Sequence, residues 1–177
     1  MVIIFYIIAT ILFNPNIAVA TSYIYIAYED YASGNYEIFL KKVDASNGNV
    51  AWRKRITWTS GTSENPAIVA YNGYIYIAYE DKTPGNVEVF LKKVDASNGD
   101  VAWRKRITWT SKNSFRPAII GYEGYIYIAY YDDTPGNAEV FLKKVDASNG
   151  NVAWRKRITW TSGASRHPAI TYVPGTV

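Results

Sequence analysis

The chain has 177 residues, no cysteine, a single histidine and a formal net charge of +4. The lack of cysteine excludes disulfides, thiolate metal sites and a cysteine nucleophile, and one histidine excludes a metal site built from several histidines. Aromatic residues make up 16% of the chain, which favours strands over helices, and the mild positive charge requires no nucleic-acid partner.

The first twenty residues form a segment of their own. An apolar run over 1–13 is followed by the helix-breaking Asn14-Pro15-Asn16 and then by Ala18-Val19-Ala20. This order is typical of a secretory signal peptide, and the apolar run is shorter than the roughly 20 residues of a membrane span. We therefore expect residues 1–20 to be removed and residues 21–177 to be secreted or associated with the cell envelope. The alternative is an uncleaved anchor, which would be the only membrane attachment we expect.

The rest of the chain repeats one unit three times. The units cover residues 23–73, 74–124 and 125–175 with no insertion between them, so Trp52, Trp103 and Trp154 are each 51 residues apart. A period of this length is the sequence signature of a repeat architecture.

Each unit predicts four strands. In the first unit they cover residues 23–29, 37–44, 49–59 and 66–71, and Asn-Gly steps such as Asn72-Gly73 mark tight turns. No helical period follows residue 20. Four short antiparallel strands in about 50 residues match the size of a β-propeller blade, whereas an immunoglobulin-like sandwich needs about 100. The predicted fold is therefore all-β, a β-propeller of three near-identical four-stranded blades.

The stretch over residues 66–103 resembles a blade of the sialidase-like, Asp-box (BNR-repeat) propellers. The turn at Asp44–Gly48 departs from the Asp box, because Gly48 lies four residues before Trp52 rather than three. This spacing is closer to the turn of quinoprotein-like (PQQ-type) propeller repeats. Either resemblance implies that the strand at 66–71 is the innermost of its blade and that the following three strands lie progressively farther from the central axis.

The ends of the repeats predict a particular assembly. The repeats begin at the second strand of a blade and end at a lone innermost strand, Pro168–Tyr172. Propellers have about 4–8 blades, so three do not comfortably close a ring. We expect a homodimer with six blades, in which each C-terminal strand completes the first blade of the partner. The alternative is that the sequence is a fragment of a longer propeller.

The loops at one end of the blades carry most of the differences between repeats. These loops follow the second and the fourth strand of each blade, whereas the turn Asp44–Asn49 barely changes between copies. The loop that leads into the innermost strand should lie near the central channel. Candidate ligand-binding residues there are Glu64, Asn65, Phe115, Arg116, Arg166 and His167, with Tyr31, Lys82, Asp132 and Asp133 farther out. We interpret them as a recognition surface on a rigid scaffold; the alternative is drift in surface loops.

The motifs for catalysis are incomplete. Phe115-Arg116-Pro117 resembles the F-R-I-P segment of sialidases, whose arginine binds a carboxylate, but the isoleucine is missing and no complete sialidase set can be placed on the repeats. The cofactor pocket and calcium ligands of quinoproteins come from insertions that this chain lacks. We therefore expect no catalytic residues, no metal and no cofactor.

Trp58, Trp109 and Trp160 lie near the end of the outermost strand, and we expect them to pack between blades, with stacking on sugar rings as the alternative. The predicted function is a secreted, non-enzymatic binding or scaffolding module for a surface glycan or an extracellular protein. The alternative function is that of a fragment of a sialidase-like or quinoprotein-like propeller enzyme.

Overall fold

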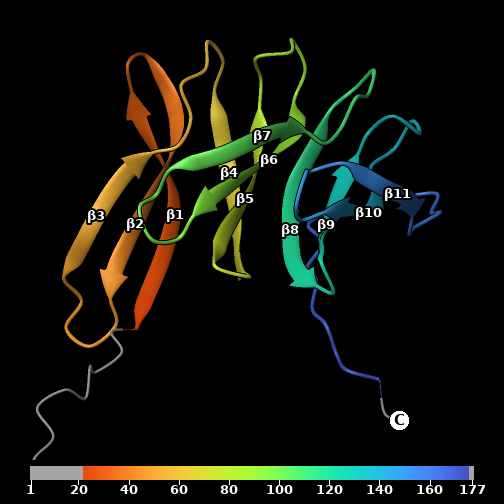
Figure 1. Cartoon of the computed structure of the whole chain (residues 1–177). Coiled ribbons are helices and arrows are strands. Elements are labelled where there is room, and N and C mark those ends of the chain that lie inside the picture. The colour runs from red at the N-terminus through yellow and green to blue at the C-terminus, as the bar shows by residue number, and fades with distance from the viewer. Residues whose placement is uncertain (1–21, 176–177) are drawn as a thin grey trace, which may run out of the picture.

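The computed structural model describes residues 22–175, which form strands and connecting loops (Figure 1). The all-β prediction is confirmed for this part of the chain, and no helix in it is long and apolar enough to cross a membrane. The predicted signal peptide over 1–20 lies outside the described residues.

Eleven strands form three antiparallel sheets, which stand side by side in chain order (Figure 1). The first sheet contains β1 (Tyr23–Ala32), β2 (Asn35–Asp44) and β3 (Val50–Arg55). The second contains β4 (Ser63–Tyr71), β5 (Tyr74–Asp81), β6 (Glu88–Asp95) and β7 (Val101–Arg106). The third contains β8 (Ser114–Tyr122), β9 (Tyr125–Asp132), β10 (Glu139–Asp146) and β11 (Val152–Arg157). Strand order within each sheet follows chain order, as in a propeller blade, and the array of sheets is open rather than closed.

The first sheet has three strands and lacks an inner strand, as expected from repeats that begin at the second strand of a blade. The predicted C-terminal strand Pro168–Tyr172 is not a strand, because it has no neighbouring strand to pair with in the described residues. Outer strands also end earlier than predicted. β3 ends at Arg55, and the Ile56 amide makes one further hydrogen bond to β2, to the Ile38 carbonyl at 2.7 Å.

The alternating pattern of each repeat places apolar residues on both faces of the second and third sheets. Ile75, Ile77 and Tyr79 of β5 face the first sheet, whereas Tyr76 and Ala78 face the third. Two apolar cores result, one at each junction between neighbouring sheets. Burial of these side chains is the main favourable contribution to folding.

Polar contacts recur at both junctions. The Trp103 indole donates to the Ser148 carbonyl at 3.0 Å, and the Tyr76 hydroxyl donates to the Ala147 carbonyl at 2.7 Å. The ammonium group of Lys143 donates to the Ile107 carbonyl. The first junction has the same three contacts, 51 residues earlier in the chain, from Trp52, Tyr25 and Lys92. The repeats therefore use one junction design twice.

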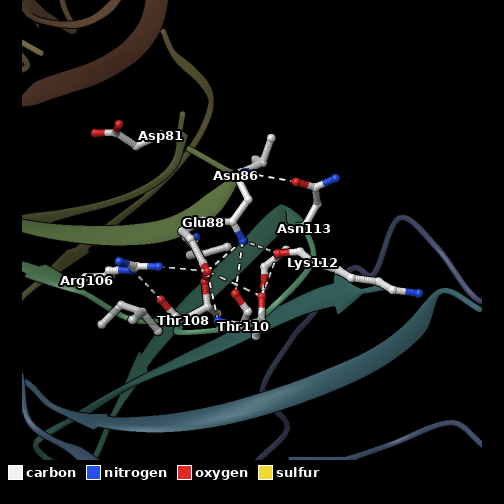
Figure 2. Close-up of polar contacts among 12 residues, drawn as sticks. Asp81, Asn86, Glu88, Arg106, Thr108, Thr110, Lys112 and Asn113 are labelled. Atoms are coloured by element: carbon white, nitrogen blue, oxygen red, sulfur yellow. Dashed lines mark hydrogen bonds and ion pairs between the residues drawn. The ribbon is translucent and has the colours of Figure 1, made fainter. Parts of the chain in front are cut away.

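A buried carboxylate in each repeat holds the loop after the outer strand. Glu88 accepts hydrogen bonds from the Arg106 guanidinium at 2.9 Å and from the Thr110 amide at 2.9 Å (Figure 2). Asn86 donates to the same oxygen at 3.0 Å and reaches the loop carbonyls of Thr110 and Lys112. Burial acts to raise the pKa of Glu88, but hydrogen bonds from Thr108, Thr110 and Arg106 outweigh it and hold the pKa below the usual glutamate range. This network links the two loops at the variable end of the blade.

The prediction that Trp58, Trp109 and Trp160 pack between blades is wrong. Their exposed fractions are 67%, 73% and 70%. The strand has already ended before each of them, so the side chain turns outward and lies under the guanidinium of an arginine three residues earlier, at 4.0 Å from the ring centre for Trp109. Trp52 and Trp103, in contrast, pack between neighbouring sheets.

Candidate functional site

Three dipeptides at the start of the inner strands line one pocket. They are Asn65-Pro66 of β4, Arg116-Pro117 of β8 and His167-Pro168 at the C-terminal segment, and the pocket has a volume of about 260 Å³. We call it the inner-strand pocket. Its three non-proline residues occupy the same position in successive repeats but differ in chemistry: an amide, a guanidinium and an imidazole. The structure thus brings together three of the six inner candidates from the sequence.

These three residues share an unusual backbone conformation. Asn65, Arg116 and His167 have φ values of 52°, 51° and 53°, in the left-handed region that is uncommon for residues other than glycine, and among those it is most often adopted by Asn, Asp and His. The proline after each residue disfavours the right-handed helical region for it. In β4 and β8 a register shift occurs at the same place, between Glu64 and Ala67 and between Phe115 and Ala118. A bulge and a left-handed residue re-aim a side chain, and both concentrate at functional sites.

Acidic residues of the neighbouring sheet hold this conformation. The backbone amide of Asn65 donates to the Glu29 carboxylate at 2.8 Å, and the backbone amide of Arg116 donates to the Glu80 carboxylate at 2.9 Å. In the third repeat Tyr131 replaces the glutamate, and its ring centre lies 5.8 Å from that of His167. Each left-handed loop residue is therefore supported by the preceding blade.

Sequence reasoning missed Glu80 and Tyr131. The sequence did contain a signal for them: the run Tyr-Ile-Tyr-Ile-Ala-Tyr is followed by Glu29 and Glu80 in two repeats but by Tyr131 in the third. Burial raises the pKa of Glu80, and the hydrogen bond from the Arg116 amide opposes that effect. Burial also raises the pKa of Tyr131, and the nearby Glu80 carboxylate adds to the shift.

Aromatic rings and a second arginine adjoin the pocket. Phe115 stacks on Tyr131 with ring centres 5.1 Å apart. The Arg166 guanidinium lies 6.0 Å from the centre of the Tyr131 ring. Arg116 donates to the amide oxygen of Asn65 at 2.7 Å. Within residues 22–175 neither Arg116 nor Arg166 forms an ion pair.

The remaining candidates lie away from the pocket lining. Glu64 is paired with Lys82 at 2.9 Å, Tyr31 is exposed and packs edge-on against Tyr36, and Asp133 is half-buried.

The prediction of Asp132 as a ligand-binding residue on the loop surface is wrong. Asp132 is the last residue of β9 and is fully buried, and its carboxylate is 3.5 Å from the Arg155 guanidinium. It also accepts from the Thr134 amide at 2.7 Å. The equivalent Asp81 makes the same contact with Arg104. This aspartate therefore stabilises the loop instead of facing a ligand.

The turn Asp44–Asn49 has a structural explanation. The Asp44 carboxylate accepts from the Ser46 amide at 2.8 Å, which is an Asx turn. Among residues 22–175 no group of three or more His, Asp or Glu side chains is placed to hold a metal ion.

No protein-family model matches the chain, and no curated protein is similar to it. Solved structures do match, among them a europium-containing methanol dehydrogenase with a TM-score of 0.54 and 15% sequence identity. The match covers 77% of this chain and 23% of that chain. At this identity the likeness shows a propeller-like fold alone. It agrees with the quinoprotein-like resemblance of the repeats, and no comparison supports the sialidase-like one.

Proposed function

We propose that the protein is an exported binding module whose inner-strand pocket binds the carboxylate of an acidic sugar on a surface glycan. One observation carries this proposal. Three residues in left-handed conformations, each different, converge from an otherwise repeated scaffold on one pocket. Left-handed residues other than glycine that the surrounding structure holds in place are typical of sites that serve a function.

The chemistry of the pocket favours a carboxylate attached to a ring. Arg116 and Arg166 each offer a planar set of N–H donors, which match a carboxylate in geometry and charge. The imidazole of His167 adds a third polar group next to them. The stacked rings of Phe115 and Tyr131 offer an apolar surface for a sugar ring.

Titration calorimetry with uronic-acid and sialic-acid oligosaccharides tests the proposal, with neutral oligosaccharides of the same length for comparison. We expect binding of an acidic ligand that weakens at least tenfold in Arg116→Ala and in Arg166→Ala. Arg53→Ala is the matched control, because Arg53 lies on the outer strand and pairs with Asp30 at 3.0 Å. Equal affinity for neutral sugars, or equal losses in all three variants, would exclude the pocket as the binding site.

The second candidate is a fragment of a quinoprotein-like or sialidase-like enzyme, favoured by the fold likeness to the methanol dehydrogenase. The described residues do not fit the metal of that relative, since they hold no group of three acidic or histidine side chains. We expect no dye-linked methanol oxidation after addition of the quinone cofactor with calcium or europium, and no hydrolysis of a fluorogenic sialoside. Turnover in either assay would favour the enzyme.

A further inference from the structure

The array of sheets has two uncovered end faces that differ from each other. We call the face of each sheet with the residues equivalent to Ile75 and Ile77 its front, and the face with the residues equivalent to Tyr76 and Ala78 its back. At each junction the back of one sheet meets the front of the next. The front of the first sheet, with Ile24, Ile26 and Lys41, has no sheet before it in the described residues. The back of the third sheet, with Trp154 and Ile158, has no sheet after it.

Both end faces are apolar copies of surfaces that are buried at the junctions. Ile24 is 53% exposed, whereas the equivalent Ile75 is 1% exposed. Ile158 is 50% exposed, whereas the equivalent Ile56 is fully buried. Contiguous apolar surface of this kind marks an interaction site on a soluble protein.

The polar groups of the two end faces are complementary. At the junctions a lysine from the front of one sheet reaches a carbonyl on the back of the previous sheet, as Lys92 does with Ile56. Lys41 is the equivalent donor on the open front, and the Ile158 carbonyl is the equivalent acceptor on the open back. In the same way, the Trp154 indole is the equivalent donor on the open back, and the Ser46 carbonyl is the equivalent acceptor on the open front. In the described residues none of these four groups makes its junction contact.

The packing around one glycine agrees with this correspondence. A Cβ atom on Gly99 would lie 3.1 Å from the Trp52 ring, and one on Gly150 would lie 3.0 Å from the Trp103 ring. The equivalent Gly48 has no atom within 4 Å of a Cβ placed there. The position beside Gly48 on the front of the first sheet is therefore open, whereas a tryptophan ring fills the equivalent position at the two junctions.

The C-terminal segment lies where the inner strand of a further sheet would lie. Tyr172 stacks on Tyr122 with ring centres 3.9 Å apart. In the same relation one repeat earlier, Gly121 of β8 packs on the ring of Tyr71. Ile170 borders an apolar pocket on the back of the third sheet, and the segment continues without a strand partner (Figure 1). The first sheet, conversely, lacks the inner strand that β4 and β8 provide to the other two.

We infer that two copies of this chain bind head to tail and close a ring of six sheets. The front face of each copy covers the back face of the other, and residues 168–172 of each copy add to β1 of the other as its inner strand. Each junction joins unlike faces, and the two junctions of such a dimer are equivalent by a two-fold axis. A ring of six sheets is within the range of about 4–8 blades that propellers use. The inference does not depend on the ligand of the inner-strand pocket.

Sedimentation velocity of the full chain over a range of concentrations tests the assembly. We expect a species of twice the chain mass. Ile26→Lys on the front face and Ile158→Lys on the back face should each weaken it at least tenfold. Both side chains are about half exposed, so the fold tolerates the change. Val101→Lys is the control, because the valine at this position is exposed in all three repeats and should leave the dimer intact.

Mixing the two face variants distinguishes a head-to-tail contact from other modes. Each variant alone can form only damaged junctions. In the mixture, the intact back of the Ile26→Lys chain can bind the intact front of the Ile158→Lys chain. This one intact junction should give a heterodimer, whereas neither variant should dimerise with itself. A monomeric wild-type chain, a series that grows without limit, or a mixture that stays monomeric would overturn the inference.

A cysteine cross-link tests the added strand separately. Ala67 pairs with Ala78 and Ala118 with Ala129, so Ala169 should pair with Ala27 of the second copy. The chain has no cysteine. We expect Ala169→Cys and Ala27→Cys chains to form a disulfide-linked heterodimer after mixing and oxidation. Ala102→Cys on the outer strand is the control in place of Ala27→Cys. Equal yields from the two mixtures would overturn the strand exchange.

Discussion

The guanidinium of Arg116 donates a hydrogen bond to the side-chain oxygen of Asn65 at 2.7 Å, and the two residues occupy the same position in consecutive repeats. Both have left-handed backbones. Neighbouring inner strands therefore bring equivalent residues into contact. A single substitution in one repeat changes one wall of the inner-strand pocket while the scaffold stays the same.

The conformation of Arg116 predicts an unequal response to substitution. Asparagine tolerates the left-handed region, whereas a β-branched residue is strained there. We expect Arg116→Asn to be more stable than Arg116→Val by about 1–2 kcal/mol. Urea denaturation of the two variants measures the difference. Equal stabilities would show that this loop relaxes out of the left-handed conformation.

The two tryptophans of a repeat should differ in their contribution to stability. Trp103 packs against the core between the second and third sheets and donates to Ser148, so Trp103→Ala should lower the free energy of unfolding by about 3 kcal/mol. Trp109 is exposed and contacts the Arg106 guanidinium, so Trp109→Ala should cost less than about 1 kcal/mol. Thermal and urea unfolding of both variants check this order, and the reverse order would contradict the packing described above.

Replacement of the buried carboxylate at position 88 should destabilise the protein near neutral pH. Glu88→Gln removes the charge that accepts from Arg106 and Thr110, and breaking such a buried pair costs about 3 kcal/mol. The pKa of Glu88 is held below its usual range, so its contribution is present above the pKa of an unfolded glutamate and is lost as pH falls through the folded value.

Urea denaturation at neutral and acidic pH measures this effect. We expect the gap between wild type and Glu88→Gln to narrow in acid. Asp100→Asn is the control, because Asp100 is exposed and its pair with Lys54 at 3.5 Å is worth about 0.5 kcal/mol or less. A gap that stays constant down to pH values where glutamate is protonated would exclude the charge as its cause.

The buried lysines predict a rise in stability with alkaline pH. Burial, with a smaller effect of nearby arginines, lowers the pKa of Lys92 and Lys143 to about 8. Between this value and the pKa of an unfolded lysine, the unfolded chain binds more protons, so the free energy of unfolding increases with pH. Below about pH 8 both amines are charged and this gain is absent.

We expect an increase of about 1–2 kcal/mol per lysine between about pH 7.5 and pH 9.5. Urea denaturation across this interval measures it, and Lys92→Met combined with Lys143→Met should flatten the profile. Lys93→Met serves as the control, because the Lys93 ammonium lies over the Tyr74 ring instead of against a buried carbonyl. A flat wild-type profile would mean that the two amines remain protonated when buried.

Much of the scaffold could be predicted from local sequence, and much of the pocket could not. The alternation over residues 74–81 and the Asn72-Gly73 turn predicted a hairpin, because side-chain alternation and turn conformation are properties of neighbouring residues. The same reasoning misplaced Trp58 and Asp132. Whether Trp58 is covered depends on where the strand leaves the sheet, and whether Asp132 faces outward depends on Arg155, which is distant in sequence.

The sequence by itself determined the period of 51 residues, the all-β class and the end of the blades at which the repeats differ. These follow from residue types and short spacings. Only the tertiary structure decided that Asn65, Arg116 and His167 line one pocket and that Glu80 supports Arg116. The physical reason is that these relations arise from packing between sheets, where residues 36 to 51 positions apart meet, and no local pattern encodes which of them touch.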